Sequence, residues 1–223
     1  MSGFVDGLDA FQRGDYTTAV RLWSEAAEHG DVRSQFNLGV LYDEGQVVPK
    51  NDWEAAFWFR RAAEQGYADA QYNLAVMFLA GQGVGRDEAQ AVHWFHQAAE
   101  QDHADAQFNL AQMYAEGTGV AQDYAESVRW LQRAADGGNR QAPNNLAIRY
   151  AMGQGVERDD LKAYMWFNFA ASQGIPQAAE LGDAGAVRHR ERVALELSAE
   201  QIVHAGRLSK EWLARLRGGQ GGR

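Results

Sequence analysis

The strongest constraint on the fold of this 223-residue chain is a near-repetition of thirteen letters. The string AEQGYADAQYNLA, which begins at Ala63, returns thirty-six residues later as AEQDHADAQFNLA. Other signals keep the same interval, with Asn-Leu pairs at positions 37, 73, 109 and 145 and tryptophan at positions 58, 94, 130 and 166. A period between about 20 and 50 residues indicates a stacked repeat architecture.

Residues 67–102 illustrate the structure that the sequence predicts for each repeat. Apolar residues around Leu74 follow the spacing of one helical face, and Gly81 is placed to end that helix in a left-handed conformation. After a glycine-rich loop, Asp87 stands where the N-cap of a second helix belongs, and that helix runs to about Gln101. Each repeat is therefore predicted to be a helix hairpin. Three such second helices are expected to open with a capping box, formed by the pairs Asn51 and Glu54, Asp87 and Gln90, and Asp123 and Glu126.

The period divides the chain into a stack with two ends. Four full repeats are expected at 31–66, 67–102, 103–138 and 139–174, because a single hairpin cannot bury its apolar face alone. Residues 1–30 are expected to form a degenerate first hairpin, with Asp15 opening its second helix. A C-terminal helical cap is expected at 175–217, with one longer helix at 176–196 and a capping box at 198–201, before a flexible tail at 218–223. The count predicts an all-α protein of about twelve helices.

Pro143 breaks the pattern of the fourth repeat. Its sister positions are Gln35, Gln71 and Gln107 in the first turn of their helices. Proline lacks the backbone N–H and is tolerated only at the start of a helix. The first helix of the fourth repeat is therefore predicted to start later than its sisters.

The strings ADAQYNLAVMFLAGQGV, DAQFNLAQMYAEGTGV and AVHWFHQAAEQ closely resemble the Sel1-like repeat (SLR) family, bacterial relatives of tetratricopeptide repeats. The resemblance covers residues 15–174. It implies a right-handed α/α superhelical solenoid that serves as an adaptor or scaffold in signalling, envelope or secretion complexes. Some cysteine-rich members have been linked with β-lactam binding or hydrolysis, but this chain has no cysteine and no S-x-x-K, G-x-S-x-G or H-E-x-x-H motif.

Charge limits the possible partners. Residues 1–185 hold 13 Lys and Arg against 26 Asp and Glu, whereas residues 186–223 hold 8 against 4. Such an acidic body repels phosphate backbones, so we expect no nucleic-acid partner. The longest apolar runs fall short of the roughly 18 residues of a membrane helix, so no membrane insertion is expected. No leader opens the chain, which favours the cytoplasm as written, or the periplasm or secretion if a leader was removed.

Two features could suggest ligand chemistry. The loops GQGVG and GTGV lack the preceding strand and the following Lys-Ser/Thr of a phosphate loop, so turn glycines are the better interpretation. His93, His96, Glu100 and His103 have spacings that could hold zinc, although sister repeats carry Arg60, Gln132 and Asn168 at the His96 position, which indicates a solvated helix face. We therefore expect no metal and no cofactor, with zinc binding kept as an alternative.

Two rows of residues on the first helices are candidates for partner binding. The row of Asn37, Asn73, Asn109 and Asn145 either holds the backbone of a bound peptide, as in related tetratricopeptide folds, or satisfies polar groups of the adjacent loops. An aromatic row is expected to face the concave groove or to pack between repeats. With the positions one turn further on, this row comprises Phe36, Val40, Tyr72, Val76, Phe108, Gln112, Asn144 and Ile148.

Arg149 replaces Leu41, Met77 and Met113 at an otherwise apolar position. It is expected either to pair with Glu180 or Asp183 of the following helix or to anchor a partner, since arginine is enriched at interface hot spots.

The sequence thus predicts a non-enzymatic protein-interaction scaffold, expected to be monomeric, with a peptide or protein segment in its concave groove. Because the body is acidic, a neutral to basic segment with apolar anchors should be preferred. A structural spacer in an envelope or signalling complex and a hydrolase of the β-lactam-related type are the alternatives.

Overall fold

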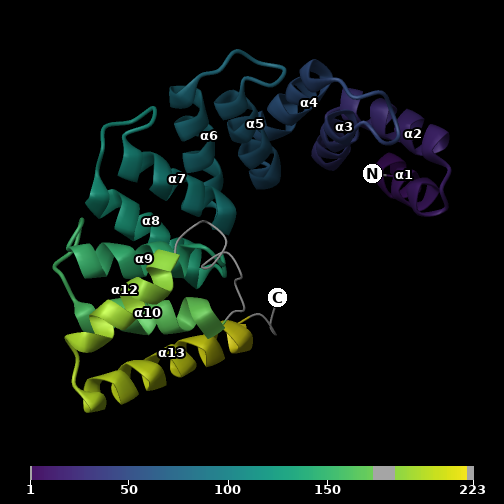
Figure 1. Ribbon diagram of the computed structural model, residues 1–223. Helices are drawn as coiled ribbons and strands as arrows, with labels where there is room; N and C mark the ends of the chain where they lie inside the picture. The colour runs from purple at the N-terminus through teal and green to yellow at the C-terminus, as the bar shows by residue number, and fades with distance from the viewer. Residues whose placement is uncertain (1, 173–183, 220–223) are drawn as a thin grey trace. The chain divides into compact units, whose positions relative to one another are not determined.

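The computed structural model describes residues 2–172 and 184–219, and all regular structure in these ranges is helical (Figure 1). Twelve helices are found there: α1 (Ser2–Gln12), α2 (Tyr16–Glu28), α3 (Val32–Glu44), α4 (Asp52–Glu64), α5 (Ala68–Ala80), α6 (Glu88–Glu100), α7 (Ala104–Glu116), α8 (Tyr124–Asp136), α9 (Ala142–Met152), α10 (Asp160–Ser172), α12 (Ala184–Leu195) and α13 (Ala199–Gly219). Helices α1 to α10 pair two by two as hairpins, whereas α12 and α13 each pack against α10. The predicted all-α class and helix count are confirmed. The chain forms two compact units, Met1–His103 and Ala104–Arg223.

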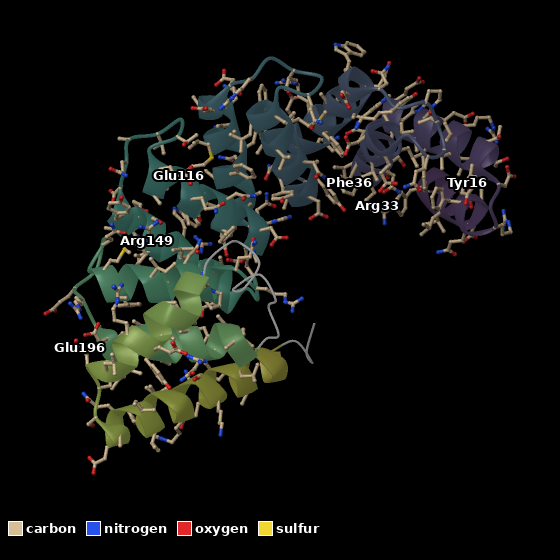
Figure 2. The ribbon with its side chains drawn as sticks, in the orientation of Figure 1. Tyr16, Arg33, Phe36, Glu116, Arg149 and Glu196 are labelled. Atoms are coloured by element: carbon tan, nitrogen blue, oxygen red, sulfur yellow. The ribbon has the colours of Figure 1, made fainter. Side chains whose placement is uncertain are left out.

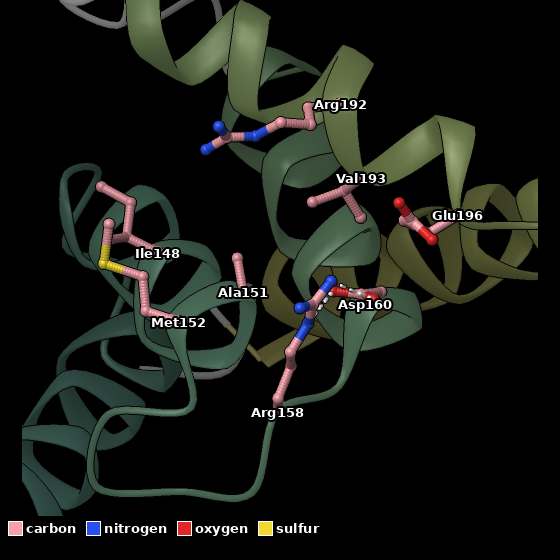
Figure 3. A pocket seen from close by; sticks show the side chains of 8 residues that line it. All are labelled: Ile148, Ala151, Met152, Arg158, Asp160, Arg192, Val193 and Glu196. Carbon is pink, nitrogen blue, oxygen red and sulfur yellow. Dashed lines mark hydrogen bonds and ion pairs between the residues drawn. The ribbon is translucent and has the colours of Figure 1, made fainter.

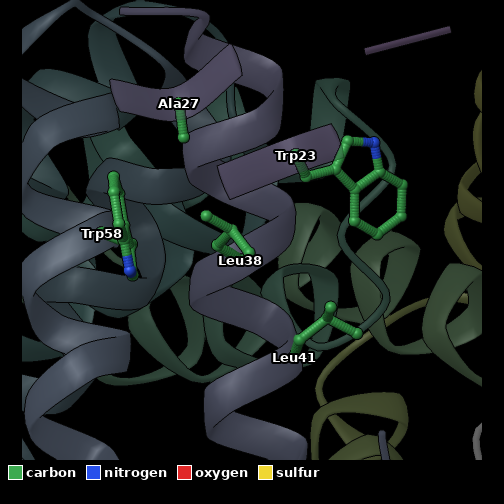
Figure 4. Packing of buried hydrophobic residues seen from close by; sticks show 5 residues of the cluster. All are labelled: Trp23, Ala27, Leu38, Leu41 and Trp58. Atoms are coloured by element: carbon green, nitrogen blue, oxygen red, sulfur yellow. The ribbon is translucent and has the colours of Figure 1, made fainter. Parts of the chain in front are cut away.

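The N-terminal unit is held by aromatic and aliphatic side chains between hairpins. Trp23 of α2 and Trp58 of α4 are buried in one cluster with Leu38 and Leu41 of α3 (Figure 4). The indole N–H of Trp23 also donates to the carbonyl of Phe4, 3.2 Å away. The Trp23 ring is therefore buried among apolar side chains, while its N–H group keeps a hydrogen-bond partner. The first hairpin is joined to the second through a shared core.

The predicted N-caps are present, but three of the predicted capping boxes are wrong. In each of them the side chain at the third helical position does not accept from the N–H group of the N-cap residue. The carboxylate of Asp87 accepts from the backbone N–H of Gln90 at 3.0 Å, as a cap should. The N–H of Asp87 itself, which Gln90 was expected to bind, donates to the carbonyl of Phe78 in the preceding helix at 3.0 Å. Asn51 and Asp123 make the equivalent backbone bonds to the preceding helix. The hairpin closure thus uses the donor that a capping box needs.

Buried glutamines link neighbouring hairpins in the N-terminal unit. The side-chain amide of Gln71 donates to the carbonyl of Ala63 at 3.1 Å, and its oxygen accepts from Gln101 Nε2 at 2.8 Å. Gln35 makes the same pair of bonds one repeat earlier, with Ala27 and Gln65. The carbonyls of Ala27 at the end of α2 and Ala63 at the end of α4 therefore each accept a side-chain donor from the next repeat.

The glycines of the inter-helix loops are turn glycines, as predicted. Gly81 ends α5 with φ +70° and Gly83 follows with φ +65°. A Cβ at Gly83 would lie 1.9 Å from the backbone oxygen of Asp52, at the start of α4. The loop of one hairpin therefore rests directly on the helix start of the previous hairpin, where only glycine fits.

Helix α9 begins at Ala142, two residues later in register than α7, which begins at Ala104. Pro143 occupies its first turn, and Asn139 caps the delayed start by accepting from the N–H groups of Gln141 and Ala142. The prediction drawn from Pro143 is confirmed.

The final helices cover the last repeat. Ser198 and Gln201 form a complete capping box at the start of α13, with both reciprocal bonds present. Trp212 of α13 packs edge-on against Trp166 of α10, with ring centroids 4.9 Å apart. The predicted helix at 176–196 is described only as Ala184–Leu195, and its earlier residues lie outside the described part of the chain.

Candidate partner-binding site

The asparagine row lies on the first helices of the four hairpins. Asn37, Asn73, Asn109 and Asn145 are all half-buried. Within residues 2–172 and 184–219, none of these four side-chain amides makes a hydrogen bond to the rest of the chain. The interpretation that they satisfy the loops of their own repeats is therefore wrong, because backbone bonds and left-handed glycines already close those loops.

The aromatic row is largely engaged in packing. Phe36 contacts the rings of Phe59 and Tyr67, with centroids 5.8 Å and 5.0 Å away, and Figure 2 locates it in the N-terminal unit. Tyr72 contacts the ring of Phe95 and stacks on His103 with centroids 4.7 Å apart. These contacts favour a structural role for the rings, so truncating them would cost stability as well as any binding.

The remaining predicted positions differ between repeats. Phe108 is only 7% exposed. Val40, Val76, Gln112 and Ile148 are half-buried. Asn144, which replaces an aromatic residue, has a buried side-chain oxygen with no hydrogen-bond partner among the described residues. At these positions the C-terminal unit therefore combines two amides, Gln112 and Asn144, with apolar residues, whereas the N-terminal unit carries aromatic and aliphatic residues only.

The structure brings four predicted residues together around one cavity of about 100 Å³ in the C-terminal unit. Helix α7 contributes Gln112 to its wall, and α9 contributes Asn145, Ile148 and Arg149. Ser127 of α8 also lines it, and the hydroxyl of this serine is buried with no hydrogen-bond partner in the part of the chain that the structure describes. Sequence reasoning missed Ser127, since a serine on the apolar side of a helix carries no signal of its own.

The direct contacts of the Arg149 side chain are with two uncharged groups. Its Nη1 donates to the side-chain oxygen of Gln154, and its guanidinium lies over the ring of Tyr124 at 4.8 Å. Burial lowers the pKa of Arg149, whereas Tyr124 and Glu116 act to raise it. The predicted partners Glu180 and Asp183 lie outside the described residues.

A second cavity of about 320 Å³ lies on the other side of Ile148, between α9, the start of α10 and α12 (Figure 3). Arg158 and Asp160 lie side by side in its wall and form an ion pair of 2.9 Å. Arg192 and Glu196 add one charge of each sign. Because its charges are balanced, this cavity shows no preference for an anion or a cation.

The N-terminal unit carries an exposed aromatic pair that the sequence analysis did not select. Trp53 and Phe57 of α4 are 61% and 39% exposed and stack with ring centroids 5.8 Å apart. The sister positions of Trp53 hold alanine or leucine, so a comparison of repeats at this position could have found it.

The histidines proposed as an alternative zinc site are engaged in separate contacts. His103 lies 3.5 Å from Asp69, whereas His96 lies 4.0 Å from Glu100. In the described ranges no group of three or more potential metal ligands is found. No described helix is long and apolar enough to cross a membrane.

The Sel1 repeat family model matches residues 4–31, 32–67, 68–103, 104–139 and 141–175. The chain belongs to the Sel1 repeat family. Its hairpins have the solenoid fold of that family, and the match treats the first hairpin as a fifth repeat. Sel1 solenoids are typical protein-interaction modules and generally non-catalytic.

Two of the solved structures that are similar to the chain have TM-scores above 0.7. A Sel1 repeat protein from Oxalobacter formigenes is 28% identical with a TM-score of 0.75, and the match covers 88% of this chain and 86% of that one. A protective antigen of uropathogenic Escherichia coli strains, which displays an SLR fold, is 31% identical with a TM-score of 0.78. That match covers 95% of this chain and 45% of the antigen. No curated protein matches the chain.

Proposed function

We propose that the protein is a scaffold whose first helices bind an extended segment of a protein partner. The observation that carries the proposal is the row of four half-buried asparagines, whose side chains make no hydrogen bond within the described chain. A side-chain amide offers both a donor and an acceptor, which match the C=O and N–H of an extended backbone. Within each unit, two such amides spaced at the period of the fold can hold a backbone without selecting its side chains.

The partner's side chains are then chosen by the surfaces between the asparagines. Half-buried apolar positions such as Val40 and Val76 suit apolar anchors. With a net charge of −9, the protein should favour a segment that is neutral to basic overall, and charge should act mainly on the association rate. Raising the salt concentration should therefore slow association more than it speeds dissociation.

Affinity capture from the source cells, followed by mass spectrometry, tests this proposal. The bait is the wild type beside the double variant Asn73→Ala/Asn109→Ala. The matched control is Gln82→Ala/Gln97→Ala, which removes two amides from exposed positions outside the row. Proteins captured by the wild type and the control but lost from the Asn73→Ala/Asn109→Ala bait support the proposal. Equal capture by all three folded baits would contradict it.

A further inference from the structure

Arg149 places a cation where the other repeats are apolar. The sister residues Leu41, Met77 and Met113 are 3–5% exposed and belong to the core. Arg149, labelled in Figure 2, is instead half-buried. It borders the 100 Å³ cavity. A charge in such a place is costly unless a counter-charge and hydrogen bonds accompany it.

Glu116 lines the same cavity and acts to raise the pKa of Arg149, but the described chain supplies no ion pair to this guanidinium. No carboxylate of residues 2–172 or 184–219 lies close enough to Arg149 to form an ion pair, and its Nε has no hydrogen-bond partner there. The contacts to Gln154 and Tyr124 are both with uncharged groups. Arginine carries five N–H donors in a planar fork that suits a carboxylate, so part of its binding capacity is unused.

The cavity has further donors and a limited size. The hydroxyl of Ser127 and the side-chain amides of Gln112 and Asn145 line the same space as Arg149. Small-molecule sites typically measure about 300–1,000 Å³. A cavity of about 100 Å³ therefore suits one side-chain group rather than a whole metabolite. Glu116 also lines it, and its negative charge disfavours a doubly charged phosphate more than a singly charged carboxylate.

We propose that this cavity binds the carboxylate of an aspartate or glutamate in the partner segment, with Arg149 and Ser127 donating to it. The inference rests on the proposed function and sharpens it: the segment, neutral to basic overall, carries one acidic residue at the α9 end. Asn145 lies in the same wall, so this asparagine and the carboxylate site can contact one continuous segment.

The anion site can be tested without any partner. Sodium acetate is titrated into the full-length protein, with sodium chloride at equal ionic strength as the control, and the Nε–H resonance of Arg149 is followed by NMR. Acetate should shift this resonance in a saturable way, and Ser127→Ala should weaken the response. No saturable shift beyond that seen with chloride would overturn the site.

The occupant is tested with two further comparisons. In Glu180→Gln/Asp183→Asn, the acetate response should equal that of the wild type. If the response appears only in this variant, the site is filled by the chain itself and the proposal is wrong. Titration with inorganic phosphate is the second comparison, and tighter binding of phosphate than of acetate would replace the carboxylate with a phosphorylated residue.

A random dodecapeptide library displayed on phage tests the link to the partner. Peptides selected on the wild type should carry Asp or Glu at one position, and changing that residue to Asn or Gln should weaken binding about tenfold or more. Arg149→Met, which restores the residue of two sister repeats, should abolish this preference, whereas Glu116→Gln should strengthen binding about two- to fivefold. Peptides that bind without an acidic preference would overturn the inference and leave the proposed function standing. Failure to select any peptide, despite an acetate response, would refute the function and the inference built on it.

Discussion

Three glycines of the loop after α5 should respond very differently to the same alanine substitution. Gly85 faces open space. Gly85→Ala should therefore change the free energy of unfolding by no more than about 0.5 kcal/mol. Gly81 has φ +70° but only ordinary contact at 3.4 Å with Arg86. Gly81→Ala should therefore cost only the left-handed strain of about 1–2 kcal/mol.

Gly83 adds a collision to that strain. Its φ is +65°, and a Cβ there would lie 1.9 Å from the oxygen of Asp52, a backbone atom that cannot move aside as a flexible side chain could. Overpacking of this kind costs about 1–3 kcal/mol, so Gly83→Ala should destabilise the protein by about 2–5 kcal/mol in total.

Urea unfolding followed by circular dichroism gives the three values, with a constant m-value confirming that the midpoints can be compared. Native-state hydrogen exchange at the start of α4 should report the same order, because the loop of Gly83 rests there. If Gly83→Ala were no worse than Gly81→Ala, the loop would not rest on α4 and the hairpin-on-hairpin contact would be wrong.

Three further predictions concern the joints of the fold. The side chains of Gln71 and Gln101 share a hydrogen bond of 2.8 Å. A double-mutant cycle on Gln71→Ala and Gln101→Ala should give a coupling of about 0.5–1.5 kcal/mol, and a coupling of zero would show that the bond adds nothing. The cap hydrogen bonds from Thr18 lower the pKa of Asp15 from 3.8. The cap should therefore be complete above pH 3.8 and be lost as the pH falls through the lower folded value, whereas Asp15→Asn should show no such loss when the amides of α2 are followed by NMR. Deleting residues 186–217 should uncover Trp166, which is 3% exposed, and should therefore lower the melting midpoint and cause aggregation. An unchanged midpoint with monodisperse elution would refute this prediction.

Most of the fold could be predicted from the sequence because its signals are local and repeat. The period, the N-cap at Asp87 and the delayed helix at Pro143 each depend on a few neighbouring residues, and the structure confirms them. The capping boxes failed because the N–H of Asp87 bonds Phe78, and this competition depends on how two helices meet.

The candidate site was less predictable for the same reason. The row of asparagines is visible in the sequence, but whether their amides are used by the chain depends on the path of every neighbouring loop. Arg149 was singled out as a break in an apolar pattern, yet its neighbours Tyr124 and Gln154 come from another helix and a loop. Ser127 lines the cavity only because α7, α8 and α9 pack together, which the sequence of α8 alone does not indicate.

The central claim is that the asparagine row contacts the partner directly. The most direct measurement is an NMR titration that follows the side-chain amide groups of Asn37, Asn73, Asn109 and Asn145 as a captured partner segment is added. We expect these four resonances to shift and to become protected from solvent exchange, while the amides of Gln82 and Gln97 stay unchanged. If the resonances of the four asparagine amides do not move from their positions in the unbound protein when the partner is saturating, the segment binds elsewhere and the central claim is contradicted.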